Sequence, residues 1–265
     1  MQQQDHPWLV RNTAPGPGRH ITITPETSPF QYISAGRILL DKTVPEITAT
    51  NDGAETTLLV LSGSGEIVVD GTSYQVTRFD GVYVPRGLTF TVRTDERIDI
   101  FEGSAPTEVE AEVAHVEFSA VKEDPDLALE VGTEPAYRDI YKVLADNIDG
   151  GKLLTGVTLS KPGNWTSWPP HEHAATQEEL YLFFDMPHPA VATQYVYSDL
   201  ANPEFVRPVY GDDAVIIVKG YHPNVAAPGF RCNFAWLLCS LEDRTWRKVG
   251  GVNVQPEYEM DTGLK

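Results

Sequence analysis

Short apolar stretches, separated by turns rich in glycine, proline and aspartate, follow one another along most of this chain. Residues 55–61 open with a glutamate and continue as an apolar run, and residues 62–65 read Ser-Gly-Ser-Gly. Residues 66–69 form the next run, before an Asp-Gly pair. This order predicts strand, glycine turn, strand and hairpin turn. The 21 glycines and 20 prolines also favour many turns over long helices, so we expect an all-β chain.

The strand pattern of the first half recurs in the second half. Residues 80–89, DGVYVPRGLT, align without a gap with residues 213–222, DAVIIVKGYH. Glu55 opens an apolar strand in the first half much as Glu179 does in the second. A single repeat of this length predicts two copies of one small antiparallel barrel or sandwich.

The boundary between the two copies is predicted from a change in composition. Residues 105–134 are acidic and only lightly apolar, which is typical of an exposed connector with one short strand. We therefore expect a first domain of residues 1–135 and a second domain of residues 136–265. The turn-rich segment 12–18 is expected to form an arm packed across a barrel.

Three histidines and a carboxylate in the second copy form the main candidate site. His171 and His173 are separated by one residue, so a strand would place both side chains on the same face. A glutamate entering the next strand, and His222 behind a glycine turn, can reach the same point. Three imidazoles and one carboxylate suit a divalent transition metal, and they leave coordination positions for water or substrate.

The glutamate of this set has two candidates, and the first copy lacks most of the set. Glu178 and Glu179 are adjacent, and strand alternation allows only one of them to face inward. In the first copy no His-x-His precedes Glu55, and Thr89 stands where the second copy has His222. We therefore expect the first copy to hold no metal and to serve a structural role.

The overall charge limits the partners that this protein can have. The net charge of −18 opposes nucleic acid, because phosphate binding needs a basic surface. An anionic substrate would need a local cation or a metal to overcome the same repulsion. The run at residues 214–218 has the length of a core strand, which argues against a membrane span.

The N-terminus and the cysteines predict a cytoplasmic protein. The first residues lack the basic and apolar regions of a signal peptide. Cys232 and Cys239 are the only cysteines, and we expect them to be buried thiols in a reducing cytosol.

Both copies resemble cupin domains, whose signature is His-x-His, a glutamate and a later Gly-x-His. The whole chain is similar to the KduI/IolB family of sugar-acid isomerases. The similarity rests on residues 12–16, 18–26, 28–30, 162–171 and 220–230. It implies two tandem cupin barrels of the double-stranded β-helix, or jelly-roll, type. It also implies that the metal ligands are His171, His173, Glu179 and His222, because the family's glutamate directly precedes an apolar-aromatic strand.

The resemblance implies an aldose–ketose isomerase that acts on 5-deoxy-glucuronate in myo-inositol catabolism through an enediol. A divalent metal would act as Lewis acid and template. Zinc is the metal that the resemblance implies, and manganese and iron(II) suit the same donors. Residues 185–187 and 234–236 look more like the sister branch, which isomerises 5-keto-4-deoxyuronate in pectin breakdown. A cupin dioxygenase and a non-catalytic sugar-binding protein are the alternatives of another class.

Several side chains are candidates for the chemistry beyond the metal. Glu178 and Tyr181 are candidate catalytic bases or proton carriers, and metal-bound hydroxide is a third possibility. The candidates for binding a small anionic sugar acid are Arg138, Lys142, Lys219, Trp168 and Gln194. A homo-oligomer is compatible with an apolar, metal-free first barrel.

Overall fold

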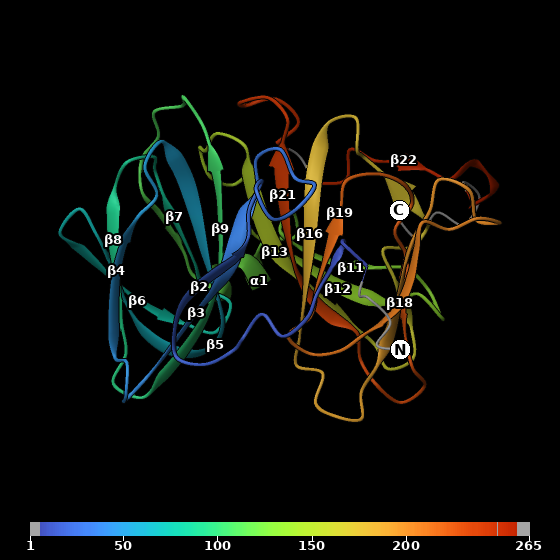
Figure 1. Ribbon diagram of the computed structural model, residues 1–265, viewed down its shortest axis with the longest axis horizontal. Coiled ribbons are helices and arrows are strands. Elements are labelled where there is room, and N and C mark those ends of the chain that lie inside the picture. The colour runs from blue at the N-terminus through green and yellow to red at the C-terminus, as the bar shows by residue number, and fades with distance from the viewer. Residues whose placement is uncertain (1–5, 248, 259–265) are drawn as a thin grey trace.

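Two β-barrels lie side by side in the computed structural model, which describes residues 6–247 and 249–258 (Figure 1). The first barrel is built on a nine-stranded sheet in the order β10-β7-β5-β9-β3-β2, extended by β4, β6 and β8. Its strands are β2 (Gly18–Ile23), β3 (Ser34–Asp41), β4 (Glu46–Thr50), β5 (Ala54–Val69), β6 (Thr72–Thr77), β7 (Gly81–Val84), β8 (Thr89–Arg93), β9 (Arg97–Pro106) and β10 (Ala114–Val116). The all-β prediction is confirmed.

The second barrel combines a seven-stranded sheet, a four-stranded sheet and a two-stranded pair. The large sheet has the order β1-β19-β16-β21-β13-β12-β11, the smaller one is β14-β20-β17-β18, and β15 pairs with β22. The strands of the large sheet are β1 (Leu9–Val10), β11 (Ala128–Val131), β12 (Arg138–Leu144), β13 (Leu153–Ser160), β16 (Gln177–Phe184), β19 (Ala214–Ile217) and β21 (Asn233–Ser240). The others are β14 (Trp165–Thr166), β15 (His171–Glu172), β17 (Ala192–Val196), β18 (Phe205–Val209), β20 (Asn224–Ala226) and β22 (Asn253–Val254).

Helices contribute little to this architecture. Helix α1 (Phe118–Glu123) lies in the connector between the barrels (Figure 1). A 3-10 turn, η1 (Pro256–Tyr258), lies near the end of the described chain. Within the described residues, neither the length nor the apolarity of any helix is sufficient to cross a bilayer.

Short strands from the first half of the chain belong to the second barrel's sheet. β1 pairs antiparallel with β19, with Leu9 opposite Val215, and β11 pairs with β12. The segment after β1 is fixed to the same barrel, because Arg11 forms an ion pair with Asp213 and the Thr13 amide donates to the Asp212 carbonyl at 2.8 Å. Both β1 and β11 precede residue 136, so two edge strands of the second barrel come from before the predicted boundary.

Three apolar cores hold the molecule together, one inside each barrel and one between them. Alternate residues of β16 serve different cores: Tyr181 and Phe183 pack inside the second barrel, whereas Leu180 and Leu182 pack against the first. Gly103 on β9 shows how closely the barrels approach, because a Cβ atom there would lie 2.4 Å from a methyl group of Leu237. This alternation decides which polar residues of β16 reach the barrel interior.

Candidate metal centre and its cavity

Glu179 projects into the second barrel, and Glu178 projects out of it. The register of β16 places Glu179 opposite Leu238 on β21 and Ile217 on β19. Leu238 and Ile217 both belong to the core inside the second barrel. Glu178 lies one residue earlier on the strand and therefore faces the first barrel.

Three donor groups of the predicted set meet inside the barrel. Glu179 Oε2 lies 3.0 Å from His173 Nε2 and 3.2 Å from His222 Nε2. The donor atoms of His173, Glu179 and His222 all lie within 4.8 Å of one another, and all three residues are buried. His171 lies beside this group, with its ring centroid 4.7 Å from that of His222. A histidine–carboxylate cluster of this kind could hold a divalent metal ion.

Backbone carbonyls orient two of the imidazoles for metal binding. The Nδ1–H of His171 donates to the Pro169 carbonyl at 2.9 Å, and the Nδ1–H of His222 donates to the Gly220 carbonyl at 2.9 Å. With Nδ1 protonated, the lone pair of each neutral ring is on Nε2. His222 Nε2 is buried and forms no hydrogen bond with any described residue. A buried nitrogen with a free lone pair next to a carboxylate is an arrangement that suits a bound cation.

The protonation states of His171 and Glu179 favour metal binding. Burial lowers the pKa of His171 to about 3, and repulsion from His222 and His173 contributes to this shift. Burial would raise the pKa of Glu179, but the neighbouring His173 and His222 lower it to about 2. His171 is therefore neutral and Glu179 ionised near pH 7, which are the forms that bind a metal.

A cavity of about 130 Å³ adjoins this cluster. Its polar lining comprises Arg138, Thr158, Ser167, His171, His173, Gln177, Glu179 and Tyr181. The rest of its wall comprises Leu129, Ile140, Phe234, Trp236, Leu238, Val249, Gly250 and Val252. Metal donors and one cationic side chain thus share a largely apolar cavity, which is the usual composition of a small-molecule site.

Arg138 is the cationic side chain of the cavity, and no described carboxylate pairs with it. Its two terminal nitrogens donate to backbone carbonyls, one to Ala136 at 3.0 Å and the other to Trp168 at 2.6 Å. Its Nε is buried and has no hydrogen-bond partner among the described residues. Burial lowers the pKa of Arg138 to about 10, so the guanidinium remains charged at pH 7. A buried cation without a counter-ion is suited to bind a ligand carboxylate.

Tyr181 has a hydroxyl partner that the sequence analysis missed. Ser167 Oγ lies 2.8 Å from the Tyr181 hydroxyl, and both residues line the cavity. Burial raises the pKa of Tyr181 well above its usual value, so its hydroxyl is protonated near neutral pH. Ser167 lies in a turn with φ 51°, where its local sequence carries no motif that indicates a role.

The C-terminal segment covers one side of the cavity, which the sequence analysis also did not foresee. Val249 and Val252 line the cavity, and the short strand β22 pairs with β15, placing Val254 opposite His171. The Gln255 amide donates to the Pro170 carbonyl at 2.8 Å. No spacing rule connects these valines with the histidines, because only the tertiary fold brings them together.

Glu178, the candidate base, lies outside this cavity. Its carboxylate accepts hydrogen bonds from the backbone amides of Gln31, Tyr32 and Ile33 in the first half of the chain, at 3.1 Å for Tyr32 and 3.4 Å for Ile33. The carboxylate is therefore used in the contact between the barrels.

The two lysine candidates also lie outside the cavity lining. Lys142 Nζ forms an ion pair with Asp146 at 3.3 Å. Lys219 is half exposed and pairs with Glu204 at 2.9 Å. Of the three proposed cations, the structure thus brings only Arg138 into the cavity.

Trp168 and Gln194 do not line the cavity, but each forms hydrogen bonds with a residue of the site. The Trp168 carbonyl accepts a hydrogen bond from the Arg138 guanidinium. The Trp168 ring packs against the Tyr258 ring, with centroids 5.0 Å apart. Gln194 is fully buried, and its amide nitrogen donates to the carbonyls of His222 at 2.8 Å and Pro223 at 3.2 Å. Gln194 thereby orients the loop that carries His222.

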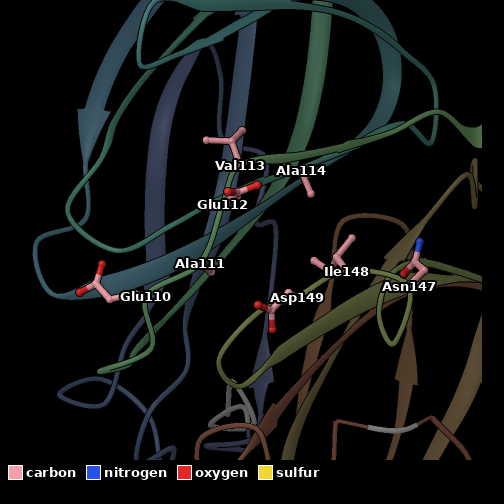
Figure 2. Close-up of a pocket in the computed structure, with 8 residues that line it drawn as sticks. All are labelled: Glu110, Ala111, Glu112, Val113, Ala114, Asn147, Ile148 and Asp149. Carbon is pink, nitrogen blue, oxygen red and sulfur yellow. The ribbon is translucent and has the colours of Figure 1, made fainter.

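A larger open groove lies elsewhere, between residues 110–114 and 147–149 (Figure 2). Its volume is about 590 Å³, and its charged lining consists of Glu110, Glu112 and Asp149. Figure 2 shows these three carboxylates well apart from one another. The groove therefore offers no convergent set of ligands comparable to the histidine cluster.

The fold and the site together define a tandem cupin with a candidate metal centre in its second barrel. The chain belongs to the KduI/IolB family, whose model matches residues 8–255. The fold is shared with an IolB-like protein from Salmonella typhimurium, with a TM-score of 0.83, 22% identity and coverage of 96% of this chain and 98% of that one. A mutant of Bacillus subtilis oxalate decarboxylase aligns with a TM-score of 0.59 at 10% identity, over 88% of this chain and 79% of the other. The predicted cupin fold and family are confirmed.

Curated relatives carry two related activities in their names. The 5-deoxy-glucuronate isomerase of Geobacillus kaustophilus is 26% identical over 253 residues, which cover 87% of each chain. The enzyme of the same name from Lacticaseibacillus casei is 26% identical, covering 78% of this chain and 81% of its own. A 4-deoxy-L-threo-5-hexosulose-uronate ketol-isomerase from Lachnoclostridium phytofermentans is 30% identical over 139 residues, or 49% of this chain and 48% of its own.

Proposed function

We propose that this protein is a metal-dependent aldose–ketose isomerase that converts 5-deoxy-glucuronate into its 2-deoxy-5-keto-gluconate product in myo-inositol catabolism. The observation that carries the proposal is the presence of a metal-donor cluster and an unpaired buried arginine in one cavity. A uronate has a carbonyl–hydroxyl pair at one end and a carboxylate at the other. The cavity supplies a suitable partner for each end.

His171, His173, Glu179 and His222 would hold the metal ion. When bound, a divalent ion, Zn²⁺ first and Mn²⁺ or Fe²⁺ as alternatives, supplies Lewis acidity for the carbonyl and the neighbouring hydroxyl. Burial of the cluster excludes bulk water, which strengthens electrostatic interactions with charge that develops on the substrate oxygens.

The other end of the substrate would bind to Arg138. Arg138 lines the cavity and stays charged near pH 7, so a carboxylate bound in the cavity would gain a charge-assisted interaction with it. The backbone carbonyls of Ala136 and Trp168 hold the guanidinium in place before the substrate arrives. This preorganisation fixes the distance between the carboxylate and the reacting carbons.

Proton movement in the enediol step is assigned to Tyr181 with Ser167. The isomerisation moves one proton between adjacent carbons and another between their oxygens. Tyr181 lies on the same face of β16 as Glu179, and its hydroxyl contacts Ser167 Oγ at 2.8 Å. A protonated tyrosine of this kind can donate to one substrate oxygen, and the proton that leaves the neighbouring substrate oxygen can return to Tyr181 through Ser167, so both side chains end the step protonated.

The direct test is an assay of purified, metal-loaded protein with 5-deoxy-glucuronate under anaerobic conditions. The proposal predicts reversible conversion that does not consume oxygen, whereas a cupin dioxygenase would require oxygen. A non-catalytic sugar-binding protein would bind the acid without producing ketose.

The second candidate substrate is 4-deoxy-L-threo-5-hexosulose-uronate. It is favoured by the relative from Lachnoclostridium phytofermentans, whose 30% identity extends over half of the chain. Parallel assays of the two uronates distinguish the two activities. Preferential conversion of the hexosulose-uronate would assign the protein to the sister activity.

A further inference from the structure

We propose that Thr158 and Trp236 form a subsite that binds hydroxyl groups of the substrate chain, away from the two carbons that isomerise. This inference rests on the proposed function and names the class of substrate that the cavity takes, a polyhydroxylated acid. It assigns a specificity role to two side chains that are neither metal donors nor part of the Tyr181–Ser167 pair.

Both side chains face the interior of the second barrel. Thr158 lies on β13 and Trp236 on β21, and both line the cavity beside the histidine cluster. Each residue is only 4% exposed. Thr158 lies directly opposite Phe234, which belongs with Trp236 to the core inside this barrel. The two side chains therefore share the inner face of the sheet.

The polar atoms of these two side chains are free to bind a ligand. The Trp236 carbonyl accepts from the Thr155 hydroxyl at 2.7 Å, but neither the indole N–H nor the Thr158 hydroxyl has a partner among the described residues. Neither atom is sealed off as Arg138 Nε is, so both remain in contact with solvent in the cavity. A polar group in such a place is normally satisfied by water or by a ligand.

The fold places the indole N–H on the strand that carries Thr158. Trp236 lies opposite Gly156, the residue two positions before Thr158 on β13. A Cβ atom on Gly156 would collide with Cζ2 of the indole and would lie 2.9 Å from Cε2. Because Cε2 carries Nε1, the N–H edge of the ring lies over Gly156. Gly156 and Thr158 are about 7 Å apart along the strand, so hydroxyl groups of one six-carbon chain can reach both groups.

The subsite lies along the sheet from the metal donors. Trp236 is opposite Tyr181 on β16, two residues after Glu179, and Thr158 is opposite Phe234, which is itself opposite Phe183. The backbone of Trp236 is therefore about one inward repeat, ~7 Å, from the row of Glu179, and that of Thr158 is one repeat further. A chain that starts at the metal can extend its middle carbons past both side chains.

The two groups are complementary to hydroxyl groups. The indole N–H only donates, whereas the threonine hydroxyl both donates and accepts. A substrate hydroxyl can accept from Trp236 or exchange a hydrogen bond with Thr158, but a methylene group would leave either of them without a partner. A site built to bind a hydroxyl rejects an analogue that lacks it. The cavity should therefore reject acids of the same length with an apolar chain.

The test compares two acids that the protein cannot isomerise. One is the alcohol obtained by reducing the aldehyde of 5-deoxy-glucuronate. The other is 6-hydroxyhexanoate, which keeps the carboxylate and the terminal hydroxyl but has no hydroxyl between them. Calorimetric titration of metal-loaded protein gives the ratio of their dissociation constants. Thr158→Val and Trp236→Phe, which keep most of the side-chain volume, should each reduce this ratio by about tenfold, through weaker binding of the hydroxylated acid.

Matched substitutions outside the cavity lining serve as controls. Trp8→Phe removes an indole N–H from a residue that packs against the core between the barrels. Thr91→Val removes a hydroxyl on β8 of the first barrel, where it contacts Thr48. Both controls should keep the wild-type ratio. Metal content and the unfolding temperature confirm that each variant is intact, and either subsite variant decides the question if the other does not fold.

The outcomes separate this inference from the proposed function. A ratio that falls in each subsite variant that folds, and persists in both controls, supports the subsite. An unchanged ratio in either folded subsite variant overturns it, as does a wild type that does not bind the hydroxylated acid more tightly. These measurements need no turnover. Absence of isomerisation, with the ratio and its loss in the variants preserved, would reject the enzyme activity and retain the subsite.

Discussion

Glu55 and Glu178 occupy equivalent positions in the two barrels, and each carboxylate is bound by three backbone amides of the other half of the molecule. Glu178 accepts from residues 31–33, and Glu55 accepts from residues 151–153, at 2.7, 2.5 and 2.8 Å for the latter set. Both side chains are buried. The two glutamates thus form a reciprocal pair of contacts between the barrels.

This relationship corrects the expected match between Glu55 and Glu179. Thr56 lies opposite Val84 on β7, and Glu179 lies opposite Ile217 on β19. Because residues 80–89 align with 213–222, Thr56 is the equivalent of Glu179, and Glu55 is the equivalent of Glu178. The sequence comparison was wrong by one residue, which reverses the face of a strand.

The first barrel has a different polar network near Thr56. The Arg19 guanidinium forms two hydrogen bonds with Glu102, each 2.7 Å long. Asn51 donates to both Thr56, at 2.7 Å, and Glu102, at 3.0 Å. In the first barrel, Arg19 therefore neutralises the buried carboxylate of Glu102. In the second barrel, Glu179 faces His173 and His222 instead.

Glu178→Gln is expected to destabilise the protein without removing its metal. The amide has no net charge and offers one oxygen in place of two, so at least one backbone amide loses its acceptor. We expect a loss of roughly 2–4 kcal/mol in the free energy of unfolding, measured by denaturant titration. Glu55→Gln should behave alike. Loss of turnover at unchanged stability would instead assign Glu178 to the chemistry.

Glu179→Gln is the matched variant for the metal site. Removing the carboxylate charge should lower metal affinity by about 100-fold or more, because a neutral amide oxygen is a weak ligand. Metal content after dialysis, measured by mass spectrometry for Glu179→Gln and Glu178→Gln side by side, checks this. Full metal retention by Glu179→Gln would exclude Glu179 as a ligand.

Arg138→Met is expected to weaken substrate binding and leave metal content unchanged. The variant removes a buried charge that has no counter-ion, but it also leaves the carbonyls of Ala136 and Trp168 without their donor, so these effects oppose each other and the free energy of unfolding should change by no more than about 2 kcal/mol. The KM for the uronate should rise by roughly 100-fold, since a charge-assisted hydrogen bond is lost. A KM equal to that of the wild type would remove Arg138 from substrate binding.

The stability of the metal-free protein should depend on pH through His171. The unfolded state binds a proton below about pH 6.5, whereas burial keeps the pKa of the folded-state imidazole at about 3. The contribution of His171 to stability is therefore complete above pH 6.5 and is lost progressively as the pH falls from 6.5 to 3. Thermal unfolding of apo wild type and His171→Asn checks this: the variant's profile should be flatter. Parallel profiles would contradict it.

The sequence predicted the parts of the site that depend on local periodicity. The two-residue period of a strand places His171 beside His173, and the same rule separates Glu178 from Glu179. The glycine turn at Gly220 indicated that His222 could join them. Cys232 and Cys239 are buried and free, as expected for apolar strand positions.

The remaining features depend on contacts between distant segments. Ser167 reaches Tyr181 through a turn, and Val249 and Val252 reach the cavity from the C-terminal segment. Leu129 lines the cavity only because β11 adds to the second barrel's sheet. Strand alternation predicted that one of the two glutamates faces away from the site. It could not identify the partners of Glu178, which lie about 145 residues earlier in the chain.

Conversion of 5-deoxy-glucuronate by purified, metal-loaded protein tests the central claim most directly, with 4-deoxy-L-threo-5-hexosulose-uronate assayed in parallel. We predict that the protein converts 5-deoxy-glucuronate reversibly into 2-deoxy-5-keto-gluconate, that removal of the metal abolishes the reaction, and that the second uronate reacts at least about tenfold more slowly. Metal-loaded, folded protein that leaves 5-deoxy-glucuronate unchanged would contradict the account.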